Sequence, residues 1–88
     1  TPARVNETPA RLLLIEDDPG AAASLKRLLA AEGHDVETVG DGTAGLHRAR
    51  AGNYDVVITD WRLPGTGGLE IIRHLHRERP RLPLILIT

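Results

Sequence analysis

Four short runs of the sequence are rich in leucine, isoleucine and valine, and they are separated by more polar segments. Three of the four are almost continuously apolar, which is typical of strands buried on both faces. The pattern predicts strands at residues 11–15, 35–39, 55–59 and 82–87.

The segments between these runs carry helical signals. Asp18 and Pro19 predict a helix start, because aspartate caps free main-chain N–H groups and proline suits the first helical position. Leucine and alanine residues then recur at spacings of three and four up to Gly33. A second helix, short and glycine-rich and therefore weak, is expected from about residue 41 to 52. A third follows the turn at residues 63–65 and must end before Pro80.

Strands and helices therefore alternate as βαβαβαβ, which predicts an α/β fold with a mostly parallel sheet and right-handed crossovers. Residues 1–10 show neither periodicity, and we interpret them as a flexible arm or linker. The length of 88 residues leaves room for one domain, over residues 11–88.

Composition excludes several classes of protein. The sequence has no cysteine, so it can form neither a disulfide scaffold nor a cysteine-ligated zinc site. Eleven basic and twelve acidic side chains give no electrostatic reason to expect binding to nucleic acid or to an anionic membrane. The apolar runs are far shorter than the roughly 20 residues of a membrane-spanning helix.

Acidic side chains follow two of the predicted strands. Glu16 and Asp17 come after the first strand, and Asp60 comes at the end of the third. If these strands are neighbours, the three carboxylates converge at the carboxyl edge of the sheet, where open parallel sheets bind ligands. An oxygen-only ligand set suits Mg²⁺, and a carboxylate beside that ion is a plausible nucleophile towards a phosphoryl group. Thr88, after the fourth strand, would offer a hydroxyl to the phosphoryl oxygens.

Each of these residues also has a plain structural interpretation. Asp18 is best explained as a helix cap, Asp60 could cap a turn, and Glu16 and Asp17 could be solvated. The joint placement of the acidic residues after two central strands favours a site. The four histidines fall on polar helix faces or near Gly33, which argues against a histidine metal site.

Four segments together resemble the receiver domain of two-component response regulators. They are residues 12–18 (LLLIEDD), 54–65 (YDVVITDWRLPG), 68–70 (GLE) and 82–88 (LPLILIT). The resemblance implies a flavodoxin-like (CheY-like) doubly wound parallel sheet of order 2-1-3-4-5. It also implies a cytoplasmic signalling domain rather than an enzyme.

Carried over to this sequence, the resemblance makes Asp60 the acceptor of a phosphoryl group from a histidine kinase or a histidine phosphotransfer protein. Mg²⁺ would be held directly by Asp17 and Asp60, through water by Glu16, and by the backbone carbonyl of Arg62. Thr88 would be the switch hydroxyl. The resemblance also allows for a homodimer, and it implies no direct contact with nucleic acid or membrane.

The sequence resembles only the first two-thirds of a receiver domain. Such domains continue with a fourth helix, a fifth strand that ends in a lysine, and a fifth helix, so the expected order here is 2-1-3-4. The only lysine, Lys26, lies in the first predicted helix and cannot be the one that contacts the phosphoryl group. We expect the isolated 88-residue chain to be unstable or to associate, because apolar surface of the sheet would be uncovered.

Two other interpretations remain open at the level of sequence. Gly40, Gly42 and Gly45 form a literal G-x-G-x-x-G, which can mark a dinucleotide site. That motif belongs in the first βα unit of such folds, whereas here a complete unit precedes it, and Asp41 adds negative charge where a pyrophosphate would lie. The other alternative is an interaction domain of the same fold that never takes up phosphate.

Overall fold

A computed structural model describes residues 9–88 and shows the expected alternation of strands and helices. The prediction of an arm at residues 1–10 falls mostly on residues 1–8, outside the described part. The elements are β1 (Arg11–Ile15), α1 (Pro19–Ala31), β2 (Asp35–Val39), α2 (Gly42–Ala51), β3 (Val56–Asp60), α3 (Gly68–Glu78) and β4 (Leu84–Ile87).

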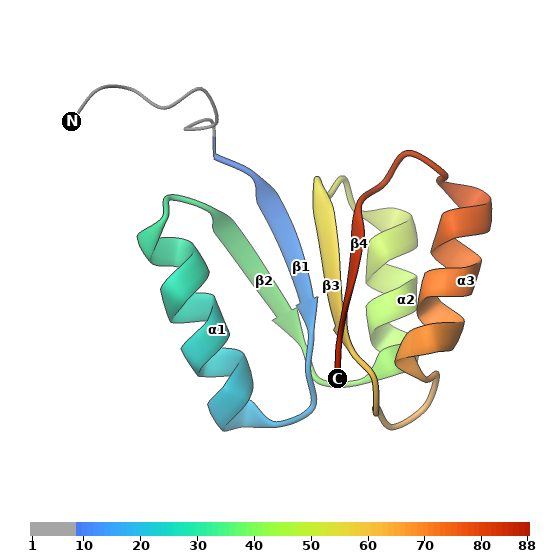
Figure 1. Ribbon diagram of the computed structural model, residues 1–88, viewed down its shortest axis with the longest axis horizontal. Coiled ribbons are helices and arrows are strands. Elements are labelled where there is room, and N and C mark those ends of the chain that lie inside the picture. Colours follow the sequence, from blue (N-terminus) through green and yellow to red (C-terminus); the bar gives the residue numbers. More distant parts are fainter. Residues whose placement is uncertain (1–8) are drawn as a thin grey trace.

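The four strands form one parallel sheet of order β2-β1-β3-β4, which confirms the predicted order. Helix α1 covers one face of the sheet, and α2 and α3 lie side by side on the other (Figure 1). All four strands run towards the same edge, at the bottom of that view. In the register of the central pair, Ile15 is the partner of Thr59, so the residues that follow β1 and those that end β3 lie at one edge.

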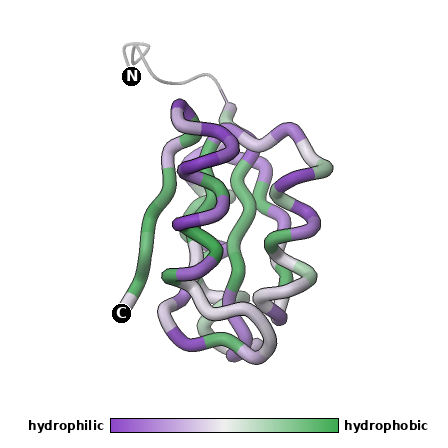
Figure 2. The backbone as a smooth tube through the Cα atoms, turned by 90° about the vertical axis from the view of Figure 1, so that its right-hand side faces the viewer, coloured by the Kyte–Doolittle hydropathy of each residue, from purple (hydrophilic) through white to green (hydrophobic). Residues whose placement is uncertain are grey.

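Two apolar cores lie on opposite faces of the sheet because successive side chains of a strand point in opposite directions. Leu13 and Ile15 pack under α2 and α3, whereas Leu12 and Leu14 pack towards α1. Figure 2 shows apolar strands between helices that alternate apolar and polar positions, with the apolar strand β4 at one edge of the molecule. The face under α2 and α3 is covered better, since α1 has no buried residue of its own.

The helix ends follow the predicted signals. The side chain of Asp18 accepts the N–H of Ala21 at 3.1 Å, so it is the cap of α1. Helix α1 ends before Gly33, whose φ of 93° is a conformation that favours glycine. Asp41 caps α2 in the same way, accepting the N–H of Ala44 at 2.9 Å.

Three predicted strand bounds were wrong by one or two residues. Strand β3 spans Val56–Asp60 rather than residues 55–59, and the side chain of Asp55, just before the strand, accepts the N–H of Arg11 at 2.7 Å. Strand β4 begins at Leu84 rather than at residue 82, because Leu82 is held in a turn by a bond from its N–H to the carbonyl of Arg79. Asp60 is the last residue of β3, so it stands at the end of the third strand as expected.

Across the described residues, every helix is too short or too polar to cross a membrane.

Candidate functional site

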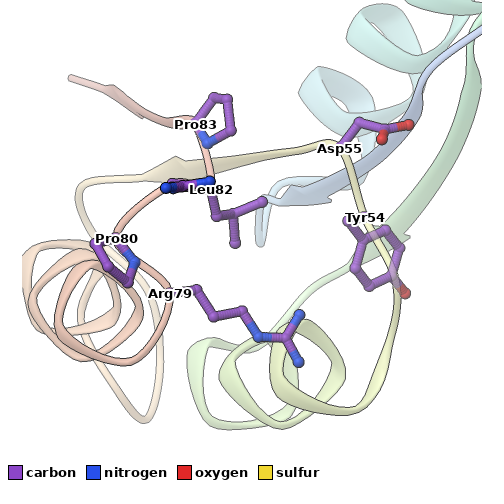
Figure 3. A pocket seen from close by; sticks show the side chains of 7 residues that line it. Tyr54, Asp55, Arg79, Pro80, Leu82 and Pro83 are labelled. Atoms are coloured by element: carbon purple, nitrogen blue, oxygen red, sulfur yellow. The ribbon is translucent and has the colours of Figure 1, made fainter.

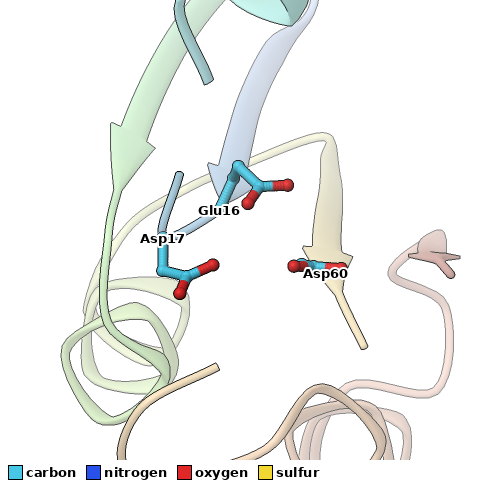
Figure 4. A group of neighbouring side chains, drawn as sticks. All are labelled: Glu16, Asp17 and Asp60. Carbon is cyan, nitrogen blue, oxygen red and sulfur yellow. The ribbon is translucent and has the colours of Figure 1, made fainter. Parts of the chain in front are cut away.

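The three acidic residues singled out from the sequence lie together at the carboxyl edge of the sheet. Glu16 and Asp17 follow β1, Asp60 ends the neighbouring β3, and one carboxylate oxygen of each lies within 4.8 Å of the others. Figure 4 shows the side chains of Asp17 and Asp60 directed towards each other, with Glu16 beside them. Within residues 9–88 it is the one group of three or more acidic, histidine or cysteine side chains with such spacing.

The backbone around Asp60 holds its carboxylate in place. The N–H of Trp61 donates to Asp60 Oδ1 at 2.8 Å and also to the carbonyl of Ile87 at the end of β4, at 2.9 Å. The fully buried Thr59 donates its hydroxyl to the carbonyl of Asp60 at 3.0 Å. The Trp61 contact could not be predicted from the sequence, because every residue except proline supplies the same main-chain N–H.

Gly68, the first residue of α3, allows that helix to approach the site closely. A Cβ at this position would lie 2.0 Å from the carbonyl oxygen of Asp60. The N–H of Gly68 donates to the carbonyl of Trp61 at 3.2 Å. A side chain here would therefore push α3 away from the end of β3. The first turn of α3 is thus fixed directly beside the acidic cluster.

The surroundings of Glu16 raise the pKa of its carboxyl group. Its partial burial raises the pKa, and the negative charges of Asp60 and Asp17 raise it further. The N–H of Asp18, which donates to Glu16 Oε2 at 3.0 Å, opposes this increase in pKa. The three carboxylates repel one another, and a bound cation would offset this repulsion.

The donor set fits Mg²⁺. Octahedral coordination with bonds of about 2.0–2.1 Å places pairs of ligand oxygens about 3–4 Å apart. The three oxygens lie within 4.8 Å of one another, so two of them could bind the ion directly with small side-chain movements. Glu16 is turned aside by its bond to the N–H of Asp18, which suits a ligand that acts through water.

The glycine motif at residues 40–45 serves packing instead of binding a dinucleotide. A Cβ on Gly42 would lie 1.7 Å from the carbonyl oxygen of Thr66, and a Cβ on Gly45 would lie 2.7 Å from the side chain of Ile15. The N–H of Gly42 already donates to the carbonyl of Pro64 at 3.0 Å. The first turn of α2 is therefore covered by the loop that follows β3, where a pyrophosphate would have to lie.

Comparison with known proteins agrees with this geometry. Residues 12–88 match the family model of the response regulator receiver domain. The chain belongs to this family. This receiver domain is similar to the transcriptional regulatory protein TcrA of Mycobacterium tuberculosis, with 41% identity over 78 residues, which are 89% of this chain and 31% of TcrA.

Two solved receiver structures are similar to this receiver domain in fold. The response regulator TrrA of Thermotoga maritima, in complex with Mg²⁺ and BeF, superposes with a TM-score of 0.85 at 34% identity, covering 88% of this chain and 67% of that one. The receiver domain of the sensor histidine kinase PA1611 of Pseudomonas aeruginosa, with a magnesium ion in its active-site cleft, also gives 0.85, at 29% identity, covering 92% and 68%. These likenesses confirm the CheY-like fold and membership of the two-component systems.

The receiver domain spans about a third of the length of the curated relatives it matches, namely 31% of TcrA, 36% of TcrX and 34% of YkoG.

Arg62 and Thr88 lie at the same edge as the acidic cluster, and within residues 9–88 no side-chain hydrogen bond or ion pair joins either of them to it. Thr88 is exposed and comes directly after Ile87, which is the register partner of Asp60, so it stands at the same edge of the sheet. Arg62 is exposed in the loop after β3, and no hydrogen bond or ion pair of its side chain is found among the described residues. Their roles in the receiver domain remain predictions.

A hollow of about 570 Å³ lies at the opposite end of the sheet and is separate from the acidic cluster. Figure 3 shows its lining, which comes from the segments that lead into β3 and β4. Arg79 there donates to the carbonyls of Arg50 and Gly52, at 2.6 and 3.3 Å, and so satisfies the end of α2. The position of Arg79 in this hollow is therefore explained by its capping of α2.

Proposed function

We propose that this receiver domain accepts a phosphoryl group on Asp60 and acts as a phosphorylation-controlled switch. The observation that carries the proposal is the convergence of the Asp60 carboxylate with those of Glu16 and Asp17 at the carboxyl edge of the sheet. A carboxylate oxygen of Asp60 attacks the phosphorus of a phosphohistidine and the P–N bond breaks. The electron pair of the P–N bond passes to the imidazole nitrogen, which takes up a proton.

The hydrogen bonds of Asp60 distinguish its two carboxylate oxygens. Oδ1 accepts the N–H of Trp61, whereas Oδ2 has no hydrogen-bond partner among the described residues. Because no donor occupies its lone pairs, Oδ2 is a better nucleophile than Oδ1. The bond to Trp61 meanwhile fixes the orientation of the carboxylate towards the incoming phosphorus.

The residues proposed to hold Mg²⁺ are Asp17 and Asp60 directly, Glu16 through water, and Arg62 through its backbone carbonyl. The close oxygen donors of the first three support this assignment, as does the magnesium reported in the TrrA and PA1611 structures. When bound, Mg²⁺ supplies positive charge that offsets the charge of the carboxylates and of the phosphoryl oxygens.

We assign the switch to Thr88. Its hydroxyl would move towards the phosphoryl oxygens once Asp60 is modified and donate a hydrogen bond to them. The register that pairs Asp60 with Ile87 supports this assignment, because it brings the residue after Ile87 to the same edge. Movement of Thr88 would carry the end of β4 with it.

The proposed phosphodonor is a histidine kinase or a histidine phosphotransfer protein, and a homodimer is a further proposal for the phosphorylated form. The domain would speed its own phosphorylation and hydrolysis, but it is a signalling acceptor rather than an enzyme. Likeness to the receiver domain of the sensor histidine kinase PA1611 supports a placement of such domains within kinases as well.

The test is incubation of the intact protein with acetyl phosphate and Mg²⁺, followed by separation of phosphorylated from unmodified protein. We expect label on the native sequence and none on Asp60→Asn. Asp55→Asn is the matched control, because Asp55 precedes the same strand at its other end. It should be labelled like the native protein.

Label that persists in Asp60→Asn, or that forms without a divalent ion, would contradict the site assignment. A folded protein that takes no label from any donor would favour the alternative interaction domain.

A further inference from the structure

A second feature lies beside the acidic cluster, and its side chains have no role in the proposed chemistry. It is a hollow of about 420 Å³ between the loop after β3 and the first turns of α3. Two large apolar side chains line it and are unusually exposed, Trp61 at 44% and Leu69 at 39%. Exposed apolar side chains that gather at one hollow are typical of an interaction surface. We call this hollow, with Trp61, Leu69, Arg62 and Arg73, the Trp61–Leu69 surface.

The arginines of this surface differ from those on the neighbouring helical face. Arg48 is paired with Glu37, and Arg50 is paired with Glu78. Arg62 and Arg73, by contrast, have no hydrogen bond or ion pair within residues 9–88, although both line the hollow. The only acidic residue in its lining is Glu70, so the surface keeps a net positive charge.

The position of the surface beside Asp60 indicates which kind of protein can contact it. Trp61 directly follows Asp60, and Leu69 directly follows Gly68, whose N–H is bonded to the carbonyl of Trp61. Even a small transient interface buries about 600 Å² on each partner, equivalent to a disc of about 14 Å radius. A protein that brings a phosphohistidine to Asp60 therefore lies within contact distance of the Trp61–Leu69 surface.

We propose that the Trp61–Leu69 surface is a docking site for the protein that carries the phosphohistidine. The partner inserts an apolar side chain between Trp61 and Leu69 and presents acidic side chains to Arg62 and Arg73. This inference rests on the proposed function and adds a recognition element that a small phosphodonor does not use. Apolar contact at the centre with complementary charge at the rim is the usual anatomy of such interfaces.

The test compares two phosphodonors on the intact protein with Leu69→Ala and with Arg73→Glu. One donor is acetyl phosphate, and the other is a ³²P-labelled histidine kinase that phosphorylates the native protein. Neither substitution changes a residue of the acidic cluster. We expect each to slow transfer from the kinase about tenfold while the rate with acetyl phosphate stays within twofold. The deficit of Arg73→Glu should shrink as salt is raised, because exposed charges are screened.

Arg81→Glu is the matched control, since it makes the same change of charge in an exposed residue at the opposite end of the sheet. Its transfer rates should equal those of the native protein, and thermal unfolding should show that all variants fold. Equal loss with both donors would mean that these residues position Asp60, and it would overturn the docking proposal. Unchanged rates would overturn it too, as would an effect on self-association alone in sedimentation. If the native protein and Asp60→Asn behaved alike with both donors, the proposed function itself would fail.

Discussion

The main-chain N–H of Thr66 donates to the side-chain hydroxyl of Thr43 at 3.1 Å. This bond joins the loop that follows Asp60 to the first turn of α2. The bond from the N–H of Gly42 to the carbonyl of Pro64 strengthens the same connection. The loop that carries Trp61 and Arg62 is therefore held at its far end by α2, a helix with no residue in the acidic cluster.

Gly42→Ala should destabilise the domain by about 1–3 kcal/mol, because its Cβ would lie 1.7 Å from the carbonyl oxygen of Thr66 and the loop must move. Gly20→Ala is the matched control. Its Cβ would meet nothing closer than 3.7 Å, inside helix α1, where alanine is the better helix former. Urea unfolding measures both free energies. A loss in Gly42→Ala no larger than the change in Gly20→Ala would show that the loop adapts without cost.

Glu16→Gln should change the pH dependence of stability in the absence of metal. Because burial and the neighbouring carboxylates raise the pKa of Glu16 above 4.5, the native state binds its proton more tightly than the unfolded state does. The free energy of unfolding therefore falls as pH rises from the ordinary glutamate pKa through the raised one. Unfolding curves at several pH values should show this decrease in the native sequence and a smaller one in Glu16→Gln.

The same substitution should weaken Mg²⁺ binding about tenfold, as expected for the loss of a group that orients a bound water. Titration with Mg²⁺, followed by the fluorescence of Trp61, measures the affinity. Glu32→Gln, at the end of α1 away from the cluster, should leave it unchanged. Equal affinities in Glu16→Gln and the native protein would remove Glu16 from the metal site.

Thr59→Val should destabilise the domain by about 1 kcal/mol. The substitution keeps the shape of a fully buried side chain but removes the hydroxyl that donates to the carbonyl of Asp60. Thr38→Val, at an exposed position of β2, should change stability by no more than about 0.5 kcal/mol. Thermal unfolding of both variants decides whether the Thr59 hydroxyl supports the end of β3.

Ile85→Thr should reduce self-association of the isolated 88-residue chain. Ile85 lies on the face of the sheet that α1 covers and is 49% exposed. Helix α1 packs against β2 and β1 and leaves β4 uncovered on that face. Sedimentation velocity at several protein concentrations measures the effect, and Leu69→Ala, on the other face, is the control. A native chain that is monomeric and unfolds cooperatively would contradict the expectation that this uncovered surface causes instability or association.

The sequence by itself determined the order of the elements and the approximate place of the site. Periods of two and 3.6 residues are local properties of the chain, and caps such as Asp18 act on neighbours a few residues away. Acidic residues after two apolar strands were enough to predict a cluster, since parallel strands end at one edge. The start of β3 was missed by only one residue, at Asp55, which still bonds to β1 through its main-chain N–H and its side chain.

Only the tertiary structure decided what depends on residues far apart in the chain. The glycines at residues 40–45 match a dinucleotide motif, but the approach of Thr66 to Gly42 gives them a packing role. Trp61 could have been buried or exposed. Its side chain is 44% exposed, and its carbonyl accepts the N–H of Gly68 where α3 approaches the end of β3. Local pattern cannot encode such distances, because they result from how helices and strands pack together.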